Sequence, residues 1–307
     1  MKITKRKWIS GMGIIFVIMA QQLSALALPP DPENAALLYY QAFCSYEKPD
    51  AALNEKVWNL SEGKIPPDPE TIKYIESCRR AIELATKAAK LRQCDWGILY
   101  SEKFYAGMGH GAEARSLFRI IAAKARIAFS QSQYDAALEC CLTARKLGIN
   151  VGRSSLLVSF LVDKAIEDRA NQVVQDILSD SKLELRTLEN LKARLTEFDS
   201  MIKPIEFYFK AEQELMALYM TPKQIQDIFD LIPPNEFTDK QACCQSAREI
   251  ILNADEEFAR KNLSFYNRAW SEIYPAIQLP YPQAFEKLVE LKGEYIDSNM
   301  DCGKNPE

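Results

Sequence analysis

Apolar residues recur three or four positions apart along much of this chain, an interval that places them on one face of an α-helix. The clearest stripes are Ile72, Ile75, Cys78, Ile82, Ala85 and Ala89 in one segment, and Leu185, Leu188, Leu191, Leu195 and Phe198 in another. Such stripes are buried when helices pack together, and short connections favour antiparallel neighbours. We therefore expect an all-α fold, built as an irregular array of antiparallel helical hairpins.

Helix start signals agree with this fold class. In Asp31-Pro32-Glu33 and Asp68-Pro69-Glu70, the aspartate caps free amides and proline takes the first helical position. Capping boxes, in which the first and fourth side chains satisfy each other's backbone donors, begin at Ser181, Thr221 and Thr238. The predicted helices span residues 32–46, 50–61, 69–91, 112–131, 134–147, 154–179, 182–201, 203–220, 222–230, 239–261, 264–274 and 282–297.

The amino end carries the pattern of an export signal. An apolar run from Trp8 to Ala20 is followed by Ala25-Leu26-Ala27, whose small residues a signal peptidase accepts. The basic residues that precede the run are Lys2, Lys5, Arg6 and Lys7. We expect residues 1–27 to be removed as a signal peptide and the protein to be periplasmic or extracellular. The alternative is that residues 8–28 remain as a membrane anchor, because about 20 apolar residues span a bilayer.

Cleavage would leave residues 28–307 as a single all-α domain, with a possible subdivision near residue 200 and a loose tail over 299–307. The full chain has a formal net charge of -4, and residues 1–27 contain four basic residues and no acidic one, so the remaining chain carries -8. Binding to nucleic acid depends largely on Lys and Arg that neutralise phosphates. An acidic chain of this kind is not expected to bind nucleic acid, and membrane contact is expected only if the amino-terminal segment is uncleaved.

The chain contains eight cysteines, and their role stays open at this stage. They are Cys44, Cys78, Cys94, Cys140, Cys141, Cys243, Cys244 and Cys302. An even number in an exported chain favours disulfides, whereas cysteine within a helical pattern also serves as a small apolar residue. No C-x-x-C spacing is present and His110 is the only histidine, so neither a metal site nor a cofactor is expected.

The segment from Ile121 to Leu147 resembles a tetratricopeptide repeat. The small and aromatic packing residues of such a repeat are matched by Ala125, Tyr134, Ala137, Leu138 and Ala144. The departures are Ala128, Cys141 and Ile149, which stand where the repeat carries two aromatics and a proline. A solenoid needs about three or more repeats, and only one copy is found, so the resemblance implies one tetratricopeptide-like hairpin within an irregular helical domain.

A wider resemblance covers about half of the chain. It runs from Asp31 to about Ile177 and rests on the strings NAALLYYQAF from Asn34, CDWG from Cys94 and SLLVSFLV from Ser155. These strings are similar to those of a group of uncharacterised exported helical proteins of planctomycete-type bacteria. The group has no known activity, so the resemblance implies a fold and an exported location only.

The candidate binding residues cluster around the longest stretch without a helical pattern, which joins Cys94 to Gly111. It concentrates aromatic residues, acids, glycines and the sole histidine, and loops of this composition often carry function. The alternative is a connection whose aromatics cover the core and whose glycines make turns. The candidate residues are Asp95, Trp96, Tyr100, His110 and Arg115.

No catalytic residue is expected, because neither a GxxxxGK[ST] phosphate loop nor a G-x-S-x-G nucleophile motif occurs. The expected function is non-enzymatic binding of a protein or cell-envelope component through a helical surface. One alternative is an extracytoplasmic hydrolase acting on glycans through paired carboxylates, with Glu212 and Glu214 or Asp255 to Glu257 as the pairs. Another is a pocket for a small apolar ligand, ringed by Phe207-Tyr208-Phe209, Phe265-Tyr266, Trp270 and Tyr274.

Overall fold

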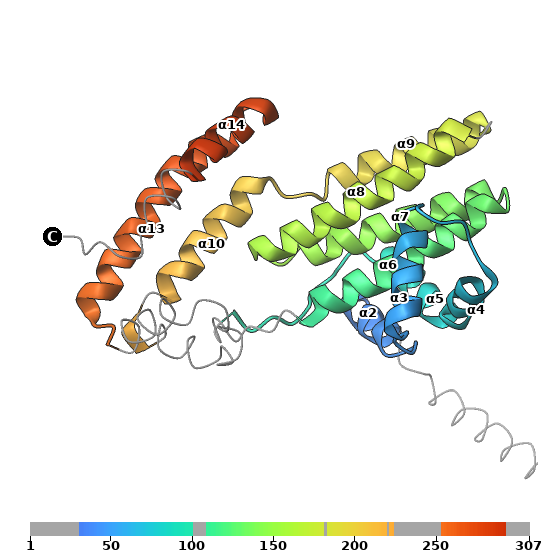
Figure 1. Ribbon diagram of the computed structural model, residues 1–307, viewed down its shortest axis with the longest axis horizontal. Coiled ribbons are helices and arrows are strands. Elements are labelled where there is room, and N and C mark those ends of the chain that lie inside the picture. Colours follow the sequence, from blue (N-terminus) through green and yellow to red (C-terminus); the bar gives the residue numbers. More distant parts are fainter. Residues whose placement is uncertain (1–30, 101–108, 181–182, 220, 224–252, 293–307) are drawn as a thin grey trace, which may run out of the picture. The chain divides into compact units, whose positions relative to one another are not determined.

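The computed structural model describes residues 31–100, 109–180, 183–219, 221–223 and 253–292 (Figure 1). The chain divides into two units, Met1–Glu33 and Asn34–Glu307, and only residues 31–33 of the first are described. Within the described ranges the regular structure is helical, and the single extended pairing is an isolated bridge between Asn34 and Gln93. The prediction of an all-α fold is therefore confirmed.

The helices labelled in Figure 1 follow one another with short connections wherever the intervening residues are described. They are α2 (Ala35–Phe43), α3 (Ala51–Ser61), α4 (Pro69–Ser77), α5 (Arg79–Ala89), α6 (Gly109–Ser130), α7 (Tyr134–Gly152), α8 (Leu157–Asp180), α9 (Leu185–Asp199), α10 (Ile205–Tyr219), α13 (Glu256–Ile277) and α14 (Tyr281–Lys292). No helix in the described ranges combines the length and the apolar character needed to cross a bilayer.

One of the two Asp-Pro-Glu start signals is used as predicted. Asp68 caps α4 by accepting hydrogen bonds from the amides of Glu70 (2.8 Å) and Thr71 (3.0 Å), with Pro69 as the first helical residue. The other prediction was wrong, because α2 begins at Ala35 rather than at residue 32. Asn34 caps that helix instead, since its side chain accepts from the amide of Ala36 and also bonds the backbone of Asp95.

Several predicted boundaries also needed correction. The helix expected over 69–91 is broken at Cys78, which separates α4 from α5. Residues 256–261 and 264–274, which were expected to belong to two helices, lie in one helix, α13, which Asp255 caps through the amide of Phe258 at 2.8 Å. Residues 224–252 lie outside the described residues, as do Ser181 and the tail over 299–307.

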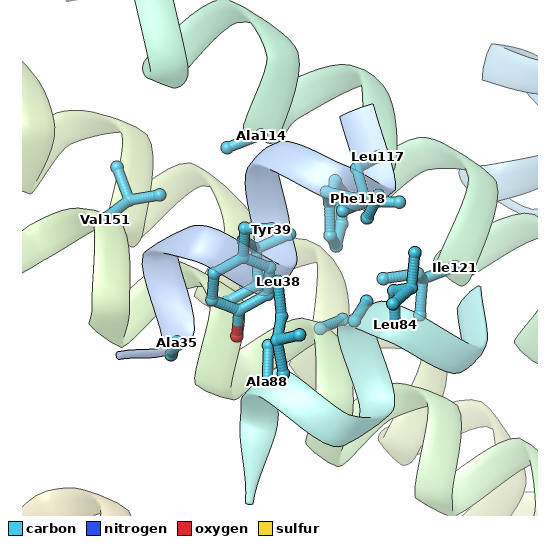
Figure 2. Close-up of a cluster of buried hydrophobic side chains, with 14 of the residues drawn as sticks. Ala35, Leu38, Tyr39, Leu84, Ala88, Ala114, Leu117, Phe118, Ile121 and Val151 are labelled. Carbon is cyan, nitrogen blue, oxygen red and sulfur yellow. The ribbon is translucent and has the colours of Figure 1, made fainter. Parts of the chain in front are cut away.

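Helix α7 lies at the centre of the packed helices. It contacts α6 and α8 extensively and also touches α5 and α9. Every residue from Cys141 to Gly152 is buried, so this part of the helix has no face turned to water. Figure 2 shows the adjoining core, where Tyr39 of α2 and Leu84 of α5 meet Leu117 of α6 and Val151 of α7. Burial of each large apolar side chain of this kind contributes about 1.5–3 kcal/mol.

Glycines allow α7 and α8 to approach closely. A Cβ atom on Gly148 would lie 2.8 Å from Asp163 Oδ1 and 3.0 Å from Ile166 Cγ2, which is closer than real side chains pack. The carboxylate that occupies this space is paired, because Arg145 donates to Asp163 at 2.6 Å and lies 3.1 Å from Glu167. The two helices are thus joined by a buried ion pair seated against a glycine.

The residues that resemble a tetratricopeptide repeat lie on α6 and α7, which are connected by residues 131–133. Ala125, Ala137 and Leu138 are buried in one apolar cluster, and Tyr134 packs against it. Ala144 belongs to the neighbouring apolar cluster, which also contains Tyr39 and Val151. Ala125 and Ala137 therefore lie between packed helices, where their small side chains allow a close approach.

The cysteines of the described residues are free thiols. They are Cys44, Cys78, Cys94, Cys140 and Cys141. Burial raises the pKa of Cys94 and of Cys141 to about 12, and Cys140 has a pKa of about 11 for the same reason. The thiolate is the reactive form, so burial keeps these three side chains unreactive and leaves them as small apolar residues. The remaining cysteines lie outside the described residues.

Candidate functional site

Asp95 and Trp96 join the connection after α5 to the helices around it. The backbone amide and carbonyl of Asp95 are both bonded by the Asn34 side chain, at 2.9 and 2.8 Å. The carboxylate of Asp95 accepts from the amide of Gly97 at 2.9 Å, which closes a turn in which Gly97 has φ +66°. This carboxylate is therefore used in shaping the chain.

Trp96 lies in the core with 6% of its surface exposed. Its ring stacks on Tyr39 at 5.6 Å and on His110 at 4.6 Å between centroids. Its indole N–H donates to the backbone carbonyl of Asn150 at 2.7 Å. The structure thus brings Trp96 and His110 together, but as packing partners in the interior.

His110 and Tyr100 also have structural contacts. His110 is 4% exposed, and burial lowers the pKa of its imidazole below the usual 6.5. Its Nε2 has no hydrogen-bond partner among the described residues. The Tyr100 hydroxyl accepts from the amide of Ser155 at 3.1 Å, which links the connection to the start of α8. A buried, neutral imidazole of this kind packs against its neighbours without reaching a substrate in solution.

Arg115 lies apart from the other four residues, in a half-open pocket of about 220 Å³ between α3, α6 and α8. We call it the arginine pocket. Its lining residues are Trp58, Ser61 and Glu62 at the end of α3, Arg115, Phe118 and Arg119 on α6, and Ala165, Ile166 and Arg169 on α8. In each set the first residue and the last are four positions apart, so each helix presents one face to the same space.

The end of α3 is fixed by a glycine cap that sets the position of Glu62. Gly63 adopts φ +71°, and the amides of Gly63 and Lys64 donate back to Leu60 and Asn59, each at 2.9 Å. This hydrogen-bond pattern is a Schellman motif, which needs a left-handed residue directly after the helix. Glu62, the residue before that glycine, is thereby turned into the pocket.

One of the three pocket guanidinium groups is paired within the chain. Glu62 lies 2.7 Å from Arg169 and 2.5 Å from Lys64, and only 5% of its side chain is exposed. The hydrogen bond from Lys64, together with the charge of Arg169, holds the pKa of Glu62 below its usual value despite the opposing effect of burial. Glu62 is therefore ionised and largely neutralises Arg169.

The other two guanidinium groups, on Arg115 and Arg119, have no carboxylate partner among the described residues. Arg119 is stacked over the ring of Trp58, with its Cζ atom 4.0 Å from the ring centroid. Burial lowers the pKa of Arg119 and the neighbouring charge of Arg115 lowers it further, while the charge of Glu62 opposes both. Both side chains remain charged, since the guanidinium keeps its proton in proteins.

The arrangement suits an anion. Guanidinium groups bind carboxylate and phosphate oxygens through paired, charge-assisted hydrogen bonds. The stacking on Trp58 holds Arg119 in place, while the remaining exposed surface of Trp58 and the side chain of Ala165 give the pocket an apolar side. Within the part of the chain that the structure describes, no three His, Cys, Asp or Glu side chains are grouped to hold a metal ion.

The sequence pointed to one residue of this pocket, Arg115, and missed the rest. The one sequence signal for the pocket was the spacing of Arg115 and Arg119. Like charges four positions apart on a helix repel each other, so such a pair suggests a site that binds an anion. Trp58 and Glu62 come from a helix more than fifty positions earlier, and no motif links them to α6. Only the packing of α3 on α6 brings the two segments together.

Several of the acids and aromatics considered for other functions have partners within the described structure. Asp255 caps α13, Glu257 lies 2.9 Å from Lys261 one turn later, and Glu212 accepts from the amide of Leu157. Of the aromatics, Tyr208 is buried and donates to the carbonyl of Gly152 at 2.7 Å, while Phe209 packs edge-to-face on Trp270.

Comparison of the chain with known protein families, with curated proteins and with solved structures finds no match. The resemblances stated above accordingly rest on sequence motifs. The functional argument rests on the geometry of the arginine pocket.

Proposed function

We propose that this protein is an exported, non-enzymatic helical module that binds a protein or cell-envelope component by receiving an anionic group of that partner in the arginine pocket. The observation that carries the proposal is the charge arrangement of the pocket. Arg115 and Arg119 face it without a carboxylate partner among the described residues, whereas the more buried arginines, Arg126 and Arg145, are paired with Asp176 and Asp163.

An anion would relieve the repulsion between the arginines of the pocket. Arg115 and Arg119 are adjacent on one face of α6, where like charges destabilise a helix by about 0.2–0.5 kcal/mol per pair. Glu62 is the one carboxylate that lines the pocket beside three guanidinium groups; it is paired with Arg169 and Lys64, and its charge also acts on Arg119. A bound anion would therefore add favourable contacts and remove an unfavourable one.

Titration with simple anions tests the proposal. Tryptophan fluorescence of the purified protein would be followed while acetate or inorganic phosphate is added, since Trp58 lies against Arg119. We expect a saturable change in the wild type that is lost in Arg115→Gln and Arg119→Gln. The matched control is Arg79→Gln, which removes the same charge from a side chain that is 85% exposed and remote in sequence.

Two results would contradict the proposal. One is the absence of saturable anion binding by the wild type under conditions where it is folded. The other is equal binding by the Arg119→Gln variant, because the site would then lie elsewhere. Circular dichroism of each variant establishes that the fold is intact.

The exported location requires its own experiment. The full chain would be expressed in a bacterial host, and the amino-terminal residue of the product in each cell fraction would be determined. We expect a periplasmic or secreted product that begins at Leu28. An intact chain recovered in the membrane would instead support anchorage by residues 8–28, and an intact cytosolic chain would contradict both.

A further inference from the structure

The arginine pocket has two chemically different sides. Arg115, Arg119 and Arg169 supply positive charge, whereas Trp58, which is 37% exposed, and the exposed Ala165 supply an apolar surface. Its volume of about 220 Å³ is large for a simple ion, because a cavity of about 10–15 Å³ already holds a water molecule. A simple ion would leave the apolar side of the pocket exposed to water.

We infer that the arginine pocket binds a carboxylate that is carried next to an apolar side chain, as at the carboxyl-terminal residue of a polypeptide. This inference rests on the proposed function and specifies the group that the pocket receives. The planar carboxylate matches the fork of Arg115 or Arg119, and the neighbouring apolar side chain covers Trp58 and Ala165. Removal of that side chain from water supplies affinity that a bare ion lacks.

The charge of the pocket also favours a chain terminus over a free amino acid. The ammonium group of a free amino acid would stand beside three guanidinium groups and a single carboxylate, Glu62, that already has two partners. In a polypeptide the same nitrogen is a neutral amide. The hydroxyl oxygen of Ser61 is one acceptor at the pocket for its N–H, because that hydroxyl donates to the carbonyl of Trp58 and keeps its own lone pairs.

Calorimetric titration of the folded protein with five probes tests this inference. The probes are N-acetyl-phenylalanine, its carboxamide, acetate, free phenylalanine and inorganic phosphate. We expect N-acetyl-phenylalanine to bind at least about tenfold more tightly than each of the others, which is the smallest effect that one charge-assisted hydrogen bond or one buried ring produces. The carboxamide separates the role of charge from that of the ring.

Variants identify the site and its apolar side. Arg115→Gln and Arg119→Gln are each expected to weaken N-acetyl-phenylalanine by at least about tenfold, and Arg79→Gln to leave its binding unchanged. Ala165 is exposed on α8, so Ala165→Phe can fill the apolar side of the pocket without disturbing the core. That variant is expected to lose the preference for N-acetyl-phenylalanine while still binding acetate as the wild type does.

The outcomes separate this inference from the proposed function. If acetate or phosphate binds as tightly as N-acetyl-phenylalanine, the inference is overturned and the anion site stands. If free phenylalanine or the carboxamide binds equally well, the assignment to a chain terminus is overturned. If no probe binds, or if the Arg119→Gln variant binds all probes like the wild type, both proposals fail.

Discussion

The indole N–H of Trp96 donates a hydrogen bond of 2.7 Å to the backbone carbonyl of Asn150, near the carboxyl end of α7. Carbonyls in the last turn of a helix have no partner within the helix. Trp96 therefore completes the end of a helix that lies more than fifty positions along the chain. This bond ties the connection after α5 to the centre of the fold.

Replacement of Trp96 by phenylalanine should reveal the worth of that bond. The change keeps an aromatic ring for stacking but leaves the Asn150 carbonyl buried and unpaired, which costs about 1–3 kcal/mol. The free energy of unfolding, measured by urea titration, should fall by at least that amount, because the smaller ring also leaves space in the core. Tyr40→Phe is the matched control, because Tyr40 is 40% exposed and its bond to the Trp96 carbonyl is long at 3.2 Å. An equal loss in both variants would contradict this reading.

The sole histidine should make stability depend on pH just below neutrality. Burial lowers the pKa of His110 in the folded protein, so the unfolded chain takes up a proton first as the pH falls through about 6.5. The stability contributed by the neutral imidazole is complete above pH 6.5 and is lost progressively as the pH falls toward the folded pKa.

Nuclear magnetic resonance of the imidazole protons gives the folded pKa of His110 directly, and a value below 6.5 is expected. The pH-dependence of urea unfolding should then be shallower between pH 7 and the folded pKa in His110→Phe, which keeps the stacking on Trp96 but does not titrate. A measured pKa at or above 6.5 would show that the ring is not buried as described.

Removal of one member of the Arg145–Asp163 ion pair should strongly lower the free energy of unfolding. Both side chains are at most 5% exposed, so Asp163→Ala leaves Arg145 with only the more distant Glu167. Loss of one member of a buried pair costs about 3–5 kcal/mol. Glu167→Ala should cost about 1 kcal/mol or less, since Glu167 is partly exposed. The free energies of unfolding of the two variants would be measured by thermal and urea denaturation. Similar losses of stability in both would contradict the prediction.

A methyl group on Gly148 should push α7 and α8 apart. The added Cβ would meet Asp163 and Ile166, and Arg145 holds Asp163 so that it cannot give way freely. Overpacking of this kind costs about 1–3 kcal/mol. Gly111→Ala is the control, because it lies within α6 with nothing within 4 Å of the new atom. That change should leave the unfolding free energy unchanged or raise it by up to about 1 kcal/mol.

The fold class was predictable because the apolar spacing and the caps are local features. Asp68 and Pro69 fix the start of α4 through neighbouring amides, and a short window of sequence contains all of them. The start of α2 was missed because Asp31-Pro32-Glu33 offers a second start signal nearby; Asn34, which caps the helix, is also bonded to Asp95, sixty-one positions away. Cys78 similarly ends α4 within an unbroken apolar stripe, so periodicity alone gave no sign of it.

The candidate site was less accessible to sequence reasoning. The loop residues Trp96 and His110 attracted attention through their chemistry, yet the same aromatic character lets them fill the core. The arginine pocket depends on which faces of α3, α6 and α8 meet. Arg119 is a candidate ligand-binding residue because it stacks on Trp58 and because Glu62 is paired with Arg169. Both are contacts between residues that lie far apart in the sequence.

The enclosed stretch of α7 from Cys141 to Gly152 bears on how this protein can change over evolutionary time. A helix with one solvent-exposed face tolerates substitutions on that face, but this segment has no such face. In addition, Arg145 bonds Asp163 and Asn150 accepts from Trp96, so each is held by a different neighbour. Substitutions should accumulate more slowly in this stretch than along the partly solvated α9 and α13. Descendants of a common ancestor would be easiest to align on these positions, even after their surfaces have diverged beyond comparison.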